Sequence, residues 1–261
     1  MRIFKPATAL FALTFLTGCF SDGDVVPVNL DYAKTNYGYI NSGDFKAGSF
    51  FLWDKGEHRM VHLSDVPGFE APPNPRDKTV QVADYTSGAS FGVGGQKAAI
   101  KAKADAMMSA RSAFEISYPN SVVFDNTITR VTRYLGNDIR DGGGLLDEWG
   151  FRTAVNDPEQ FYVLVRKVTY GDGIRLLVDG ETEVNGGFSV IIKGADVNVR
   201  VQGKGLNAIQ GTDTEVAFDV YVMRPFWKQT GAAQTPSFAV DHFVKIDGLP
   251  DLFRSTSRRD G

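Results

Sequence analysis

Residues 161–170 of this chain run Phe-Tyr-Val-Leu-Val-Arg-Lys-Val-Thr-Tyr, and this stretch decides what kind of fold the rest can join. Aromatic and β-branched residues fill it, which is typical of a strand packed against other strands. Gly171-Asp172-Gly173 follows with the residues of a tight turn, and residues 174–178 are the expected partner strand of a hairpin. The stretch therefore predicts an antiparallel sheet at the centre of the fold.

Strand patterns continue on both sides of this stretch. Apolar side chains alternate with polar ones at residues 197–201, and residues 216–222 repeat the pattern, as expected of strands with one buried face. Further strands are expected at 48–53 paired with 58–63, and at 79–85, 122–135, 188–193 and 238–246. Because Gly-rich turns and no helical spans separate most of these runs, we expect antiparallel connections.

One segment has the period of a helix. Alanines recur every four residues at Ala98, Ala102, Ala106 and Ala110, so we expect an amphipathic helix at about 96–114. The predicted class is α+β: mainly antiparallel β-sheet with one long amphipathic helix.

The proline-rich segment 67–78 suggests how the chain is divided. It cannot form a regular central element, so it is either a surface loop or a boundary. We expect an N-terminal β-rich segment at 25–66, an α+β body at 79–250 and a disordered basic tail at 251–261. A two-lobed molecule split near the prolines is the alternative.

Composition excludes several classes of protein. The 261 residues are 43% hydrophobic and 23% charged, which is ordinary globular usage. Removing residues 1–18, which hold Arg2 and Lys5 and no acid, leaves 26 basic against 31 acidic residues, a net charge of −5. Such an acidic chain is a poor partner for nucleic acid. With a single cysteine the chain has neither an internal disulfide nor a Cys-rich zinc site, and we expect no cofactor.

The N-terminus has the layout of an export signal. Arg2 and Lys5 precede an uncharged, largely apolar run at 6–18, which is shorter than the roughly 20 apolar residues that span a bilayer. The run ends Leu16-Thr17-Gly18-Cys19, and Cys19 is the sole cysteine. Residues 1–19 resemble the lipobox signal of bacterial lipoproteins, in which a small residue precedes an obligatory cysteine.

That resemblance implies a location. Leu16, Thr17 and Gly18 would be recognised by the processing machinery, the signal would be cut off, and Cys19 would carry diacylglycerol and a further acyl chain such as palmitate. Two or more chains anchor a protein stably. Residues 19–24 would form the tether. By analogy with enteric lipoproteins, Phe20 in place of Asp favours the outer membrane, facing the periplasm. The alternative is a structural thiol that happens to follow an ordinary signal.

A second motif is chemical. Gly88-Ala89-Ser90-Phe91-Gly92 matches G-x-S-x-G between an expected strand and an expected helix, where a nucleophile elbow would lie. It resembles the α/β-hydrolase elbow over these residues only, and implies Ser90 as nucleophile and His242 as base. The antiparallel chain that follows departs from that fold. The alternative interpretation, which we favour, is a Gly/Ser loop that caps the helix.

Two weaker patterns concern ions. Gly92, Gly94 and Gly95 with Lys97 could hold an anion through backbone amides at the helix start, although a dinucleotide fingerprint wants glycine at position 97. His58 and His62 would share one face of a strand and could bind a metal, but two ligands do not define a site. We predict no metal site.

No convincing catalytic set can be assembled, so we expect a non-catalytic, lipid-anchored envelope protein. It would contact the membrane through its lipid and bind an envelope protein partner or help to assemble an envelope structure. The alternatives are a lipoprotein serine hydrolase that uses Ser90 and His242, and a periplasmic carrier of an apolar ligand.

Overall fold

The computed structural model describes residues 25–29, 32–41, 43–70, 80–84, 92–93, 112–178, 183–184, 187–188, 200–203, 207–246 and 248–258. The strands are β1 (Val25–Asn29), β2 (Lys34–Thr35), β3 (Gly38–Ile40), β4 (Ser49–Asp54), β5 (Arg59–Asp65), β6 (Val80–Asp84), β7 (Gly92–Val93), β8 (Ser112–Ser117), β9 (Asn120–Val123), β10 (Gln160–Val178), β11 (Glu183–Val184), β12 (Gly187–Phe188), β13 (Arg200–Gly203), β14 (Asn207–Thr230), β15 (Ala233–Val240) and β16 (Ser257–Arg258). The helices are α2 (Thr127–Arg140), α3 (Leu145–Glu148), α4 (Phe151–Ala154) and α5 (Leu249–Ser255).

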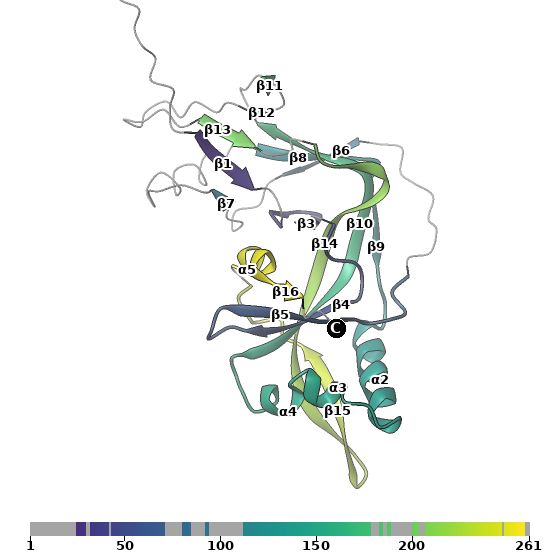
Figure 1. Ribbon diagram of the computed structural model, residues 1–261. Coiled ribbons are helices and arrows are strands. Elements are labelled where there is room, and N and C mark those ends of the chain that lie inside the picture. The colour runs from purple at the N-terminus through teal and green to yellow at the C-terminus, as the bar shows by residue number, and fades with distance from the viewer. Residues whose placement is uncertain are drawn as a thin grey trace, which may run out of the picture.

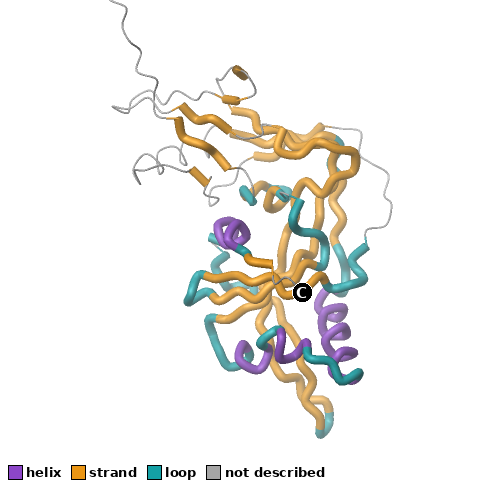
Figure 2. Tube along the Cα trace, viewed as in Figure 1, coloured by secondary structure: helices purple, strands orange, loops and turns teal. Residues whose placement is uncertain are grey.

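Two long strands form the axis of the fold. β10 and β14 pair antiparallel from Tyr162 opposite Met223 to Arg175 opposite Asn207, and several register shifts interrupt the pairing. At one end of this ribbon β4 pairs with β10 and β15 pairs with β14. Towards the other end β8 and β9 pair with β10, and β3 pairs with β14 (Figures 1 and 2). The predicted class, α+β with a mainly antiparallel sheet, is confirmed.

The turn predicted at residues 171–173 is wrong, because β10 continues through it. Gly171 is needed there for close packing between strands. A Cβ atom on Gly171 would lie 2.9 Å from the carbonyl oxygen of Ser117 and 3.0 Å from Cγ2 of Ile116. Since both contacts are tighter than side chains tolerate, glycine allows β8 to approach β10. The pairing partner of the first half of β10 is therefore β14 and not residues 174–178.

α2, which has 14 residues, lies where the composition predicted a strand at 122–135. Only β9, which ends at Val123, is extended in that range. Thr127, Val131 and Leu135 are buried at a spacing of four, so the periodicity of this segment is helical although several of its residues are β-branched. Of the helix predicted at 96–114, residues 112–114 belong to β8, and residues 96–111 lie outside the described part of the chain.

Strands β2 to β5 of the N-terminal segment share one sheet with the body, whereas β1 belongs to a separate three-stranded sheet with β7 and β13. The predicted hairpin at 48–53 and 58–63 is confirmed as β4 and β5. β4 joins β10, and β3 joins β14, so residues 34–65 are built into the same sheet as the body. The proline-rich stretch is described only as far as Glu70.

The C-terminal segment also joins this sheet, and the expectation of a disordered tail from residue 251 is wrong up to residue 258. α5 buries Leu249, Leu252 and Phe253, and β16 runs parallel to β5. These three apolar residues have helical spacing, which was overlooked because arginines follow them at 254, 258 and 259. The Phe253 ring lies 5.2–5.8 Å from five aromatic rings, those of Tyr32, Tyr39, Phe45, Phe51 and Phe218.

Successive residues of β4 divide the core into two aromatic clusters. Phe51 points towards α5 and contacts Phe45 and Phe253, whereas Phe50 contacts Trp149, which follows α3, and stacks on Tyr162. Since neighbouring side chains on a strand point to opposite faces, the sheet is covered on both faces here. No helix in the described residues is long and apolar enough to cross a membrane.

We predict that Phe253→Ala lowers the free energy of unfolding by about 3–5 kcal/mol, since it empties a buried aromatic site. Phe243→Ala is the matched control: Phe243 is 95% exposed, whereas Phe253 is 2% exposed. The control should change stability by no more than about 0.5 kcal/mol. Urea titration of both variants measures the difference, and equal effects would contradict the packed C-terminal segment.

Candidate functional site

The residues singled out from the sequence lie largely outside the described part of the chain. This holds for Leu16, Thr17, Gly18 and Cys19 of the signal, for Ser90, and for Gly94, Gly95 and Lys97 of the glycine loop. Gly92 lies in β7, opposite Asn29 of β1. His242 is exposed just after β15. The lipid anchor, the serine hydrolase and the anion loop therefore stay predictions.

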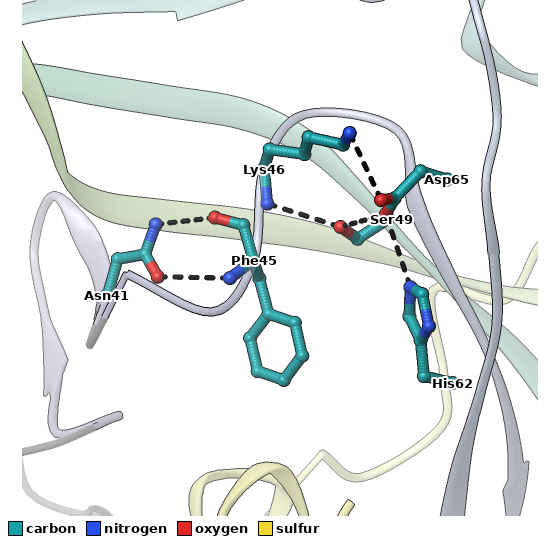
Figure 3. A network of polar contacts seen from close by, with 6 residues as sticks. All are labelled: Asn41, Phe45, Lys46, Ser49, His62 and Asp65. Carbon is teal, nitrogen blue, oxygen red and sulfur yellow. Dashed lines mark hydrogen bonds and ion pairs between the residues drawn. The ribbon is translucent and has the colours of Figure 1, made fainter. Parts of the chain in front are cut away.

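A polar network on β4 and β5 brings a serine, a histidine and an aspartate together (Figure 3). Ser49 Oγ donates to Asp65 Oδ1 at 2.8 Å, His62 Nε2 lies 3.2 Å from the same oxygen, and Lys46 Nζ lies 3.1 Å from Oδ2. A catalytic triad needs the histidine between the serine and the acid. Here the aspartate is in the middle, so the network ties the Lys46 turn to β5 instead of activating Ser49.

The surroundings of Asp65 keep it ionised. Burial by itself raises the pKa of its carboxyl, but hydrogen bonds from Ser49, Lys46 and His62, together with the charge of Lys46, outweigh burial and lower that pKa. The expectation that His58 and His62 share a strand face is wrong, since His58 lies in the turn before β5 with φ 50°. Within the described residues no three His, Cys, Asp or Glu side chains gather as metal ligands.

The most distinctive surface lies along the β14–β15 hairpin, which projects from the body (Figure 1). Arg224 holds in place the end of the hairpin that lies nearest the body. Its Nε donates to Asp241 Oδ2 at 2.7 Å, one terminal nitrogen donates to the Pro158 carbonyl at 2.8 Å, and the guanidinium lies 4.2 Å from the centre of the Phe161 ring. An arginine held by two hydrogen bonds and a ring has little freedom left.

Asp241 in turn shapes the residues after β15. The strand expected to reach residue 246 ends at Val240, because the carboxylate of Asp241 accepts the backbone N–H groups of Phe243 at 2.9 Å and Val244 at 3.0 Å. An aspartate that bonds the backbone two and three residues later stabilises a turn. This turn leaves the Phe243 side chain 95% exposed.

Phe226 is a second exposed aromatic residue and lies on the hairpin itself. It lies two residues beyond Arg224 on β14, on the same face of the hairpin, and is 39% exposed. Exposed basic residues occur on the same two segments, β14 and the turn after β15. We call this set the Phe surface, and it consists of Phe226, Lys228, His242, Phe243 and Lys245.

Sequence reasoning did not find the Phe surface. It assigned residues 238–246 to a strand, in which Phe243 would be a core residue. Asp241 followed by a polar and an aromatic residue was a weak turn signal, and its partner Arg224 is 17 residues away.

No protein-family model matches this chain, and no curated protein is detectably similar to it.

The hydrogen bonds of Asp241 lead to a prediction about how this turn responds to pH. Burial raises the pKa of Asp241, but the bonds from Phe243 N–H, Arg224 and Val244 N–H outweigh burial and hold the pKa below its ordinary value of 3.8. A lowered pKa in the folded state means that the carboxylate stabilises the fold above pH 3.8 and loses this effect as the pH falls through the lower, folded value.

We therefore expect the amide proton shifts of Phe243 and Val244 to change with a midpoint below pH 3.8 when the protein is titrated by NMR. Arg224→Gln should move the midpoint upwards, since it removes a charge and a hydrogen bond. A midpoint at or above the ordinary value in the native protein would show that the carboxylate does not hold this turn.

Proposed function

We propose that this chain is a lipid-anchored protein of the bacterial outer membrane, facing the periplasm, that binds an envelope protein partner through the Phe surface without catalysis. The observation that carries the proposal is the 95% exposure of Phe243 on a turn whose shape Asp241 determines. Aromatic residues are enriched in protein interfaces relative to the rest of the surface, and we therefore take this ring as the central contact residue.

Burial of this ring would contribute directly to affinity. Transferring a phenylalanine side chain from water to an apolar pocket is favourable by about 1.5–3 kcal/mol. The Arg224–Asp241 pair orders the turn before any partner arrives, so little conformational entropy is lost on binding. Aromatic residues are enriched in the buried centre of interfaces, and the exposed lysines beside the rings suit a polar rim.

The location rests on the lipobox at residues 16–19. A lipid anchor confines the body close to the membrane, where two acyl chains hold it stably. A protein confined in this way meets its partner at a high effective concentration, so one modest surface is enough for specific binding.

The first prediction of the proposed function concerns the lipid anchor. Cys19→Ser removes the thiol that would be acylated, so the variant should incorporate no labelled palmitate and should leave the outer-membrane fraction in cells. Cell fractionation and fatty-acid labelling measure both effects. Fractionation unchanged from the native protein, with no label in either, would contradict the anchor.

A second prediction of the proposed function concerns the Phe surface. A photo-crosslinking amino acid at position 243 or 226 should capture one and the same protein in cells, while position 139 should not. Ile139 is a matched control because it is 39% exposed, like Phe226, but lies on α2.

With the captured protein purified, Phe243→Ala should weaken binding at least tenfold, which corresponds to about 1.4 kcal/mol. Ile139→Ala should leave the dissociation constant unchanged. Equal crosslinking at all three positions, or unchanged affinity of the Phe243 variant, would overturn the proposed function.

A further inference from the structure

A second feature of the molecule shares no residue with the Phe surface. A cavity of about 480 Å³ opens between α2 and the turn that follows β5. Pro67 and Gly68 form one wall, and the other is a stripe along α2 and the residue before it, consisting of Asn126, Thr129, Arg130, Arg133, Tyr134 and Asn137. We call this cavity the α2 groove. Its volume lies within the usual range of small-molecule sites, about 300–1,000 Å³.

The described residues that line the groove are rich in hydrogen-bond donors and include no acid. They offer two guanidinium groups, two amides, a hydroxyl and a phenol. The first turn of α2 has no acidic residue either. Since the chain as a whole is acidic, with 31 acidic against 28 basic residues, this groove is a local concentration of positive charge.

Arg130 holds the two walls together. Its Nε donates to the Asp125 carbonyl at 3.2 Å, a terminal nitrogen donates to the Gly68 carbonyl, and the guanidinium lies 5.5 Å from the centre of the Phe69 ring. These partners are carbonyls and a ring, so they position the guanidinium, and no ion pair within the described residues neutralises its charge.

Arg133 lies one turn further along the same face of α2. It is exposed and has no hydrogen bond or ion pair within the described residues. Residues three apart on a helix are neighbours, so the two guanidinium groups repel each other. Thr129 and Asn137, four residues before and after Arg133, carry no charge that would relieve this repulsion. An anion in the groove would relieve it.

We propose that the α2 groove binds a phosphate monoester carried by a sugar-sized molecule. The two uncompensated arginine charges match the charge of a phosphate monoester at neutral pH, about −1.5 to −2, better than the single charge of a carboxylate. Arg133 is free to donate two parallel hydrogen bonds to phosphate oxygens. The amides of Asn126 and Asn137, the Thr129 hydroxyl and the Tyr134 ring border the remaining volume, where the uncharged part of the ligand would lie.

The test is calorimetric titration of the purified full-length protein with glucose 6-phosphate, and with glucose and glucuronate for comparison. Glucose 6-phosphate should bind, and its affinity should fall as salt is added. Arg133→Gln should weaken binding at least tenfold. Arg152→Gln is the matched control, since Arg152 is also an exposed helical arginine but lies on α4 and pairs with Asp147.

The outcomes separate the sources of the phosphate. Binding of vesicles that contain phosphatidic acid, lost in Arg133→Gln, together with no binding of glucose 6-phosphate, would assign the same phosphate chemistry to a lipid headgroup. Equal affinity for glucuronate or glucose, or an unaffected Arg133→Gln variant, would overturn the proposal. None of these results depends on the Phe surface, so the proposed function stands or falls separately.

Discussion

The pairing of β10 with β14 is the constraint on which the rest of this structure depends. The two strands stay in contact from Tyr162 to Arg175, and β3, β4, β8, β9 and β15 all attach to one of them. Because β4 attaches along β10, its alternate side chains fill both faces of the sheet. Phe51 joins the cluster around Phe253, and Phe50 joins the cluster around Tyr162. The Phe51 and Phe253 rings meet edge to face and the Phe50 and Tyr162 rings are stacked, and aromatic pairs in such arrangements add to the gain from burial alone.

Both proposed sites follow from this arrangement. β14 continues beyond the shared ribbon into the hairpin with β15, which brings Arg224 to Asp241 and leaves Phe243 in water. On α2, Val131 and Leu135 point into the core. Their burial leaves the arginine stripe of the same helix to face the turn after β5. Each proposed site therefore consists of side chains that are not buried in the core.

Much of the fold could be predicted from local patterns. Alternation at 216–222 and the β-branched run at 161–170 correctly indicated strands, since a strand buried on one face shows its period directly. α2 was missed because Thr127, Ile128 and Val131 favour strands by composition, and only their spacing is helical. α5 was missed because Arg254, Arg258 and Arg259 follow Leu252 and Phe253 and made the segment resemble a basic tail. In both helices the burial of a few apolar residues decided the structure against local propensity.

The amino-acid sequence by itself determined the class of the fold, the net charge and the positions of most strands, because these depend on residue type and short-range period. It also carries the lipobox on which the proposed location rests. Only the tertiary structure decided which polar groups found partners. Asp241 meets Arg224 across 17 positions, and Arg130 meets Gly68 across 62. Strand register and helix docking decide whether a charged side chain finds a partner, as Arg224 does, or stays exposed, as Arg133 does. They also decide whether an aromatic ring is buried or, like Phe243, exposed, and no local pattern specifies them.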